Sequence, residues 1–526
     1  MIRGFKNISY AQLSLASISG LLFAVAFIVP YAGIFSFFIL IPLFAATENS
    51  RPLDSLKLGT VAGTVANFIA TYWLTGTITN FGGFPVPASV IFHLILSAYT
   101  GLLFGLFAYI SARMGLLRTG GLAAGIMTAA LWTGIEFAFP MLFPYALSNT
   151  LSEYIVMVQV YDLLGMYTMS FFIVLINYTL FRTYKSFAGA GKLPVAELAF
   201  SLFSALCIVS YGVWRLDFVN AQIAEAPKIK IGIVQANFNI FEKLGQNESV
   251  MTARYRELSR TFRSPDLVIW PETAVQAWIP EAATHFALDG KTIVPKLDGA
   301  YFIAGGLSYI VTQTATDGIL KRDIERFNVA YMVDDKGWIL GRYHKIKLLL
   351  FGEYLPFSTW FPSIKKFSPA SGDFIPGREL TLLKGERKGI IAGPLICYED
   401  IIPSFARKFA KKGANLLVNI SNDAWFGDST EPYQHLKLST ARAVETRRFL
   451  LRATNTGISA VIDPAGRILE KTAKFEEAVI EREVALLDYQ TIYTRVGNVF
   501  PLACIAAVVI YVGAGFLRRK NSLKGG

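Results

Sequence analysis

The sequence is poor in charged residues. Only 17% of its 526 residues are Asp, Glu, Lys or Arg, whereas about a quarter is usual for a soluble protein. Apolar residues fall instead in long runs over residues 1–215 and 498–517, while the stretch between has an ordinary soluble composition. This distribution excludes a purely soluble enzyme, a disordered chain and a transporter built only of helices. It indicates a membrane protein that carries one large water-facing domain.

The apolar runs are long enough to predict membrane helices, since a spanning helix needs about 20 apolar residues. Eight runs approach this length: residues 9–29, 31–47, 58–79, 87–111, 120–140, 158–181, 195–215 and 498–517. We therefore expect a membrane domain of seven helices over residues 1–215. These helices are followed by a catalytic domain over residues 216–497. An eighth helix with a short tail is expected over residues 498–526.

Lysine and arginine are absent from the loops near residue 30, at 77–86 and at 141–157. The alternate flanks carry them: Arg3, Lys6, Arg51, Lys57, Arg113, Arg118, Arg182, Lys185, Lys192, Arg518, Arg519, Lys520 and Lys524. Because basic flanks stay cytoplasmic, both termini are predicted to be cytoplasmic. The soluble domain is predicted to lie outside the bacterial cytoplasmic (inner) membrane, on the periplasmic side. No nucleic-acid motif is visible, and we expect no nucleic-acid partner.

Cysteine occurs three times, and Cys207 and Cys504 fall in apolar runs. Cys397 is therefore alone in the exported domain, which excludes a disulfide framework there. A solitary thiol is a liability in an oxidising compartment. Cys397 is either a buried, inert residue or a functional one, and its neighbours must decide between these interpretations.

Histidine is equally scarce, and none of the four is placed for a Cys–His pair. His93 lies in an apolar run, His285 is isolated, and His435 falls in a predicted helix. His344 is beside Lys345 and is expected to point to the opposite face of its strand. A cysteine nucleophile without histidine needs another base, and a desolvated carboxylate can serve.

From Pro227 onward the pattern is typical of alternating strands and helices around a buried sheet. The sequence DDKG at Asp334–Gly337 predicts a hairpin turn. Strands are expected at residues 228–237, 267–270, 301–304, 328–333, 338–343, 389–397 and 415–420, and helices at 246–262, 402–412 and 432–448.

Three of the expected strands end at a reactive residue: Glu272 in WPETA, Lys345 in YHKIK and Cys397 in LICYED. A thiolate can attack an acyl carbon, a carboxylate can take its proton, and an ammonium can lower the thiol pKa and stabilise the oxyanion. Each residue also has a simpler interpretation. Glu272 could begin a helix, and Lys345 could lie on the surface as most lysines do.

The stretches WPET, HKIKLLLFGEYLPF, CYED and ARAVETRRFLLRATNTG resemble the nitrilase superfamily. With the apolar helices, including Glu136 in LWTGIEFAFP, they resemble the apolipoprotein N-acyltransferase family over nearly the whole chain. The resemblance implies a polytopic α-helical membrane base and an α/β nitrilase-like αββα sandwich. It implies that Glu272 is the general base, Lys345 the oxyanion-stabilising lysine and Cys397 the nucleophile.

The same resemblance implies supporting roles for three more residues. Glu353 in FGEYLPF matches the second glutamate of the family, and Tyr398 and Glu399 match residues that flank the nucleophile. One departure is Leu244, where family members often carry a tryptophan that contacts substrate.

The reaction implied by the resemblance has two steps. Cys397 takes an acyl chain from a phospholipid as a thioester, and the α-amino group of a diacylglyceryl-cysteine at an apolipoprotein N-terminus then accepts it. This chemistry requires no metal and no organic cofactor, and we expect a monomer among membrane lipids. Two alternatives remain open: a membrane-tethered amidohydrolase that uses water as acceptor, and a lipid-sensing receptor without catalysis.

Two further features each have two interpretations. The segment Leu348–Phe367 is rich in Leu, Phe, Trp and Pro, so it is either a core-packing loop or a lid that dips into the membrane interface. Glu136 is either a functional intramembrane carboxylate or a brace between helices.

Overall fold

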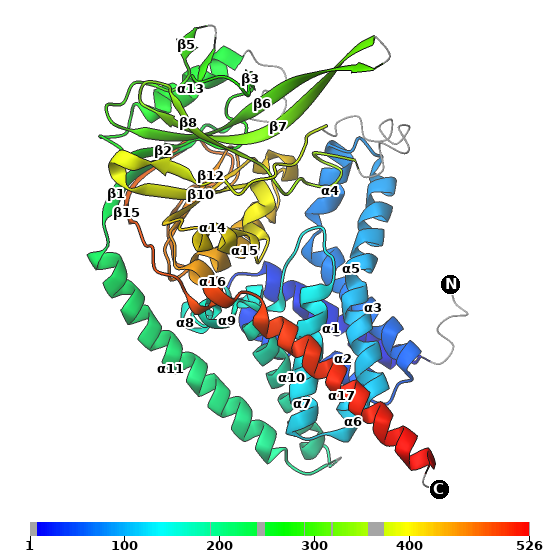
Figure 1. The fold of residues 1–526 in the computed structure, drawn as a ribbon. Helices are drawn as coiled ribbons and strands as arrows, with labels where there is room; N and C mark the ends of the chain where they lie inside the picture. Colours follow the sequence, from blue (N-terminus) through cyan, green and yellow to red (C-terminus); the bar gives the residue numbers. More distant parts are fainter. Residues whose placement is uncertain are drawn as a thin grey trace. The chain divides into compact units, whose positions relative to one another are not determined.

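The computed structural model describes residues 8–189, 191–238, 248–288, 290–316, 319–355 and 373–524 (Figure 1). The chain divides into two compact units. The helical unit comprises Met1–Gly76, Pro85–Leu216 and Val496–Gly526, and the α/β unit comprises Thr77–Phe84 and Asp217–Arg495.

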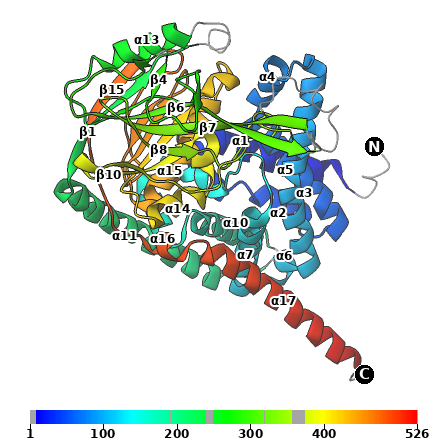
Figure 2. The same cartoon turned by 45° about the horizontal axis from the view of Figure 1, so that its top comes forward.

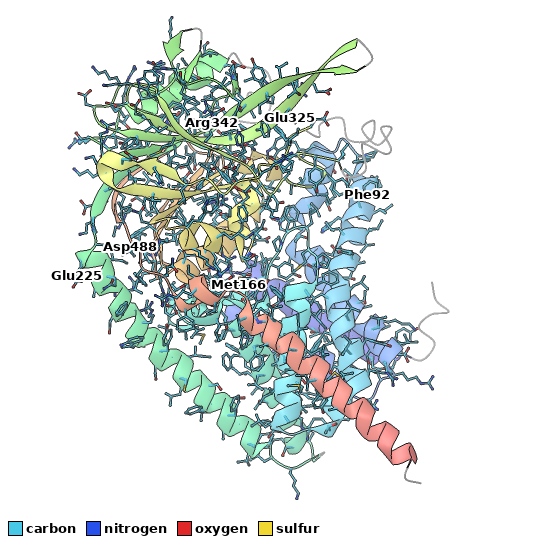
Figure 3. All side chains as sticks on the ribbon, viewed as in Figure 1. Phe92, Met166, Glu225, Glu325, Arg342 and Asp488 are labelled. Atoms are coloured by element: carbon cyan, nitrogen blue, oxygen red, sulfur yellow. The ribbon has the colours of Figure 1, made fainter. Side chains whose placement is uncertain are left out.

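The apolar regions form helices whose lengths vary widely. They are α1 (Tyr10–Ile28), η2 (Ala32–Phe37), α2 (Ile41–Thr47), α3 (Pro52–Ala70), α4 (Trp73–Asn80), α5 (Val86–Met114), α6 (Leu116–Thr119), α7 (Leu122–Ala138), η3 (Leu147–Leu151), α8 (Ile155–Val158), α9 (Tyr161–Leu164), α10 (Tyr167–Phe187), α11 (Val195–Glu225) and α17 (Val499–Lys524). Glu225, at the end of α11, is labelled in Figure 3.

Among the described residues, the three helices α1, α5 and α11 are long and apolar enough to cross a membrane. A fourth span exists if Ile155–Leu164 and Tyr167–Phe187, bent by 120°, are counted together. The predicted number of eight is therefore not confirmed. Mean hydropathy does not reveal backbone breaks such as the one at Gly165, whose φ of +83° cannot continue a right-handed helix.

Small residues allow α3 and α5 to pack closely side by side. A Cβ added to Gly63 would lie 2.6 Å from the Cα of Gly101, and one added to Gly59 would lie 2.4 Å from the carbonyl oxygen of Phe104. Such close backbone approach gives apolar helices van der Waals contact where the hydrophobic effect between them is weak.

Glu136 on α7 is buried and hydrogen-bonded. Its Oε1 accepts from Trp132 Nε1 at 3.1 Å and from the backbone N–H of Leu147 at 2.6 Å. These contacts link α7 to η3, as the brace interpretation requires.

The α/β unit contains two large sheets in its described residues. One has the strand order β15-β1-β2-β6-β7-β8, with β3 beside β6, and the other has the order β14-β13-β12-β11-β10-β9. The strands of the first sheet are β1 (Lys228–Gln235), β2 (Leu267–Ile269), β3 (Trp278–Pro280), β6 (Tyr301–Thr316), β7 (Ile319–Asp334), β8 (Ile339–His344) and β15 (Ala478–Ala485). Those of the second are β9 (Leu383–Gly385), β10 (Ile390–Ile396), β11 (Leu416–Ser421), β12 (Leu450–Thr454), β13 (Ala460–Ile462) and β14 (Ile468–Lys471).

The remaining elements of this unit are short strands, helices and single helical turns. They are α13 (Glu248–Ser259), β4 (Ala287–Leu288), β5 (Lys291–Thr292), η5 (Glu386–Lys388), η6 (Cys397–Ile401), α14 (Phe405–Lys411), η7 (Asp423–Phe426), α15 (Glu431–Thr446) and α16 (Ile492–Val496).

Helices cover the outer face of each sheet. Helix α13 lies on the first sheet, and α14 and α15 lie on the second (Figures 1 and 2). One buried apolar cluster fills the space between the sheets, with Ile231 and Ile303 from the first and Ala392 and Val418 from the second. A second cluster lies between the first sheet and α13. The predicted αββα order is therefore confirmed.

The expected strands and helices of this unit are present, although β6 and β7 are much longer than expected. They pair along their whole lengths as an antiparallel hairpin that extends past the neighbouring strands (Figure 2). The turn at DDKG is present, and Gly337 takes a φ of +90° there, which favours glycine. The expected list omitted β3, β4, β5, β9 and β12–β15, because most of these strands are only two to five residues long and give a weak periodic signal.

Candidate active site

The three residues predicted to be catalytic follow strands in two different sheets. Glu272 lies three residues after β2, Lys345 directly after β8, and Cys397 directly after β10. Strand β6 comes very close to the loop of Glu272, because a Cβ on Gly305 would lie 2.3 Å from the carbonyl oxygen of Pro271. The core packing of the two sheets therefore brings these strand ends together.

Lys345 lies at the centre of the site and is only 1% exposed. Its Nζ is 3.2 Å from Glu272 Oε1 and 2.9 Å from Glu353 Oε1. Burial alone would lower the pKa of Lys345, but the charges of Glu272 and Glu353 raise it well above its usual value. Lys345 is therefore an ammonium held between two carboxylates, and the interpretation as a surface lysine is wrong.

Asn328 on β7 joins the two glutamates and was not singled out in the sequence. Its Nδ2 donates to Glu272 Oε1 at 2.7 Å and to Glu353 Oε1 at 3.0 Å. The main-chain carbonyl oxygen of Asn328 accepts from the backbone N–H of Lys345 at 2.8 Å. The signal available in the sequence was a polar residue at the start of the otherwise apolar stretch NVAYMV.

Cys397 is 8% exposed and adopts a φ of +54°. A non-glycine residue in this left-handed region costs roughly 1–2 kcal/mol, and such conformations cluster at functional sites. Asn419 Nδ2 donates to the Cys397 carbonyl oxygen at 2.8 Å. The backbone therefore turns sharply at the end of β10 and is held in that turn by the next strand.

The thiol of Cys397 has a pKa well above its usual value. Burial raises it most, and the negative charge of Glu272 raises it further, while Lys345 lowers it. The expectation that the lysine would lower the thiol pKa is correct for that single interaction but wrong for the sum. Cys397 is therefore a neutral thiol at rest, and a base must take its proton when it attacks.

Glu353 and Tyr398 enclose Lys345 from the side of the following loop. Glu353 Oε2 accepts from the backbone N–H of Leu349 at 2.8 Å. The ring of Tyr398 lies 5.9 Å from Lys345 Nζ, and its hydroxyl donates to the Leu348 carbonyl at 3.0 Å. Residues 356–367 of the apolar loop lie outside the described residues, as does Leu244.

Glu399 does not contact the ammonium but organises the backbone around it. Its carboxylate accepts from the N–H groups of Ile346 and Lys347 at 2.9 Å, from that of Ile396 at 2.8 Å, and from the Tyr343 hydroxyl at 2.9 Å. It thereby ties the end of β8 to the end of β10. Burial raises the pKa of Glu399 to about 7, although the backbone hydrogen bonds oppose the rise.

Removal of the Tyr343 hydroxyl should destabilise the fold in a pH-dependent way. The pKa of Glu399 is higher in the folded state than its ordinary value of 4.5, so its contribution to stability is greatest at low pH and declines as pH rises through about 7. Tyr343→Phe should cost about 1–2 kcal/mol, with the larger loss at pH 8, where the carboxylate is charged. Thermal unfolding in detergent at pH 5 and pH 8, relative to the wild type, measures this.

Tyr331→Phe is the matched control for that measurement. Tyr331 is also buried, on the neighbouring strand β7, but its hydroxyl donates to the neutral carbonyl of Leu307 at 3.2 Å. Its stability loss should be the same at both pH values. Identical, pH-independent losses for both variants would contradict the assignment of Tyr343 as a donor to a charged Glu399.

Histidine contributes no hydrogen bond to Cys397 within the described ranges. His344 Nε2 lies 3.1 Å from Glu281, on the other side of β8 from Lys345. His435 Nε2 lies 2.9 Å from Asp400. The site therefore provides a thiol with carboxylates and an ammonium, which is a set of groups suited to acyl transfer without histidine.

The chain is similar to carbon-nitrogen hydrolases and to apolipoprotein N-acyltransferases. The carbon-nitrogen hydrolase family model matches residues 230–493, and the model of the apolipoprotein N-acyltransferase N-terminal domain matches residues 19–179. The apolipoprotein N-acyltransferase of Geobacter metallireducens is 34% identical over 98% of this chain and 97% of its own length. That of Bdellovibrio bacteriovorus is 31% identical over 90% of this chain and 88% of its own.

Among solved structures, an amidase from Nesterenkonia sp. is 19% identical, covers 53% of this chain and 96% of its own, and has a TM-score of 0.35. Nit3 of Saccharomyces cerevisiae, from the nitrilase superfamily, is 17% identical, covers 52% and 95%, and has a TM-score of 0.35. Because a relative above 30% identity matches almost the full length of both sequences, the chain belongs to the apolipoprotein N-acyltransferase family.

Proposed function

We propose that this protein transfers an acyl chain from a phospholipid, through a thioester on Cys397, to the α-amino group of the N-terminal diacylglyceryl-cysteine of apolipoproteins. The observation that carries the proposal is the buried Lys345 ammonium, held at 3.2 Å by Glu272 and at 2.9 Å by Glu353 beside a buried thiol. Membership of the acyltransferase family supports both the acyl-transfer reaction and the lipid-linked acceptor.

In the first half-reaction Glu272 accepts the thiol proton as Cys397 Sγ attacks the ester carbonyl of the phospholipid. The tetrahedral oxyanion forms beside the Lys345 ammonium, which stabilises it in a water-poor site. When the intermediate collapses, the C–O bond breaks and the protonated Glu272 returns its proton to the leaving oxygen. The products are a lysophospholipid and an acyl-Cys397 thioester.

In the second half-reaction the α-amino group of the acceptor attacks the thioester carbonyl. Glu272 accepts a proton from the attacking nitrogen, and the new oxyanion again lies beside Lys345. Collapse breaks the C–S bond, and the proton on Glu272 returns to the departing sulfur. Glu353 and Asn328 hold the lysine and the base in place through both steps.

The proposal includes a location in the membrane, because the acyl donor is a membrane lipid and the acceptor is anchored by lipid. Apolar helices such as α1, α5 and α11 suit a membrane protein. The orientation predicted from the basic flanks puts the catalytic domain on the periplasmic side, where lipoproteins mature. The domain boundaries at residues 215 and 497 are proposed on the same basis.

Intact-mass spectrometry of protein incubated with phospholipid, without an acceptor, tests the covalent step. The wild-type protein should gain the mass of one acyl chain, and hydroxylamine should remove it because it cleaves thioesters. A diacylated peptide added afterwards should take up the chain. If the acyl-enzyme instead decays at the same rate with and without peptide, water is the acceptor and the amidohydrolase alternative holds. If no adduct forms, covalent catalysis is refuted.

A further inference from the structure

A buried group of charged residues lies next to the nucleophile, and none of the steps above uses it. This charged cluster consists of Asp400 on η6, Asp423 on η7, Glu431 and His435 on α15, and Arg452 on β12. All five side chains are buried, and Arg452 is 0% exposed. Burying so many ionisable groups is costly unless they are paired and hydrogen-bonded.

Arg452 is the residue that pairs the cluster. Its Nη1 donates to Asp400 Oδ2 at 2.8 Å, and its Nη2 donates to Asp423 Oδ2 at 2.9 Å. His435 Nε2 lies 2.9 Å from the other oxygen of Asp400. The planar guanidinium can bridge two carboxylates in this way, whereas a lysine ammonium is a point charge.

Hydrogen bonds across three neighbouring strands of the second sheet connect the charged cluster to the nucleophile. Leu395, Asn419 and Arg452 are register partners on the adjacent strands β10, β11 and β12. Arg452 Nη1 donates to Asn419 Oδ1 at 2.8 Å, and Asn419 Nδ2 donates to the Cys397 carbonyl oxygen at 2.8 Å. A second route is shorter, because Asp400 belongs to the same helical turn as Cys397.

This double attachment matters because the turn it holds is strained. Cys397 adopts a φ of +54°, and such a conformation persists only where the surroundings determine it. The direction of Sγ depends on that backbone conformation. A misplacement of about 1 Å by a residue away from the chemistry can cost roughly 100-fold in rate.

We propose that Arg452 is a positioning residue for acyl transfer, because it holds the Cys397 turn through Asn419 and Asp400 and so keeps Sγ aligned with Glu272 and Lys345. The proposal rests on the proposed role of Cys397 as nucleophile. Arg452 contacts neither the predicted base nor the lysine, so its effect reaches the reaction only through the backbone of the turn.

Another use of the cluster would be to bind a cation. Ligand-type atoms of Asp423, Glu431 and His435 all lie within 4.8 Å of one another. However, Arg452 already occupies one oxygen of Asp423. Asp400 and Asp423 raise the pKa of His435 to about 10 against the opposing effects of burial and Arg452. Two cations therefore already balance two aspartates, which favours the positioning role.

Arg452→Lys tests the proposal, with Arg448→Lys as the matched control. Arg448 is equally buried but donates to backbone carbonyls, including those of Ala414 at 2.6 Å and Tyr489 at 2.8 Å. Both changes keep a positive charge and remove the planar fork. Arg452→Lys should lower kcat for acyl transfer about 10- to 100-fold, with the KM for phospholipid changed less than about two-fold because Arg452 does not touch substrate. Arg448→Lys should leave kcat within about two-fold.

A second readout does not depend on any lipid substrate. In a background of Cys207→Ala and Cys504→Ala, the rate of Cys397 alkylation by iodoacetamide is followed against pH. If the turn relaxes in Arg452→Lys, the thiol becomes better solvated, and the midpoint of the profile should move down toward the ordinary cysteine range. The midpoint in Arg448→Lys should stay at the wild-type value.

Asn419→Ala provides the test if Arg452→Lys does not fold, since it removes one link to Cys397 and no charge. Its kcat should fall less than that of Arg452→Lys, because the route through Asp400 remains, and the double variant should lose no more than Arg452→Lys alone, because Arg452 acts through both routes. Wild-type kcat in Asn419→Ala or Arg452→Lys, or an unchanged alkylation profile, would overturn the proposal. If the wild type forms no acyl-Cys397, the proposed function fails, while the alkylation comparison still tests the positioning role.

Discussion

Cys397→Ser should reduce N-acyl transfer by about 1000-fold or more. The hydroxyl of serine is far harder to deprotonate than a thiol, and the site offers Glu272 as base rather than a histidine. The side chain is nearly isosteric with cysteine, so the fold should remain intact. The measurement is the rate of acylation of a diacylated lipopeptide by the purified protein in detergent with excess phospholipid.

The other two cysteines provide the controls for this result. Cys207 is exposed on α11 and Cys504 is buried on α17, and both belong to the helical unit. Cys207→Ala and Cys504→Ala should each retain most of the activity. Substantial transfer by Cys397→Ser would contradict the requirement for a thiol nucleophile at this position. Loss in either alanine variant would show that another thiol is required.

Lys345→Arg should lower the single-turnover rate of acyl-enzyme formation by about 100- to 1000-fold. The ammonium is enclosed by Glu272 at 3.2 Å, Glu353 at 2.9 Å and the ring of Tyr398 at 5.9 Å. A guanidinium keeps the charge, but it is larger and planar and cannot occupy the same point between the carboxylates. The oxyanion then loses its positioned cation. Rapid-quench mass spectrometry of the enzyme after mixing with phospholipid measures the rate.

Lys347→Arg is the matched control, because Lys347 lies two residues after Lys345, in the loop that follows β8, and its side chain is exposed. Only its backbone N–H contacts the site, through Glu399 at 2.9 Å. This variant should acylate at the wild-type rate. A normal rate in Lys345→Arg would mean that the position of the lysine charge does not matter, and Lys345 would then be no oxyanion ligand.

The strands that carry the reactive residues could be predicted because their signals are local. The strands β2, β8 and β10, which precede Glu272, Lys345 and Cys397, end within one residue of the expected ends. The apolar helices were less predictable. A run of suitable hydropathy does not reveal that residues 155–187 bend by 120°, because the bend depends on the backbone conformation of one glycine.

Supporting residues could be anticipated only where the sequence motif was known. Glu353 and Glu399 were expected from the family resemblance, but their partners Asn328 and Tyr343 were not, because an asparagine or tyrosine within a strand is usually unremarkable. The same holds for Asn419 and Arg452. Their importance follows from hydrogen bonds between segments that are separated in sequence by up to 56 residues.

The sequence by itself indicated the candidate residues for chemistry and the alternation of strands and helices in an α/β domain, because strand periodicity and turn residues are short-range properties. Only the tertiary structure decided the protonation states. The position of Lys345 between two carboxylates, and the balance of burial and charge that raises the pKa of Cys397, depend on sheet packing between segments more than 70 residues apart. Desolvation and Coulomb interactions depend on distance in space, and distance along the chain does not determine them.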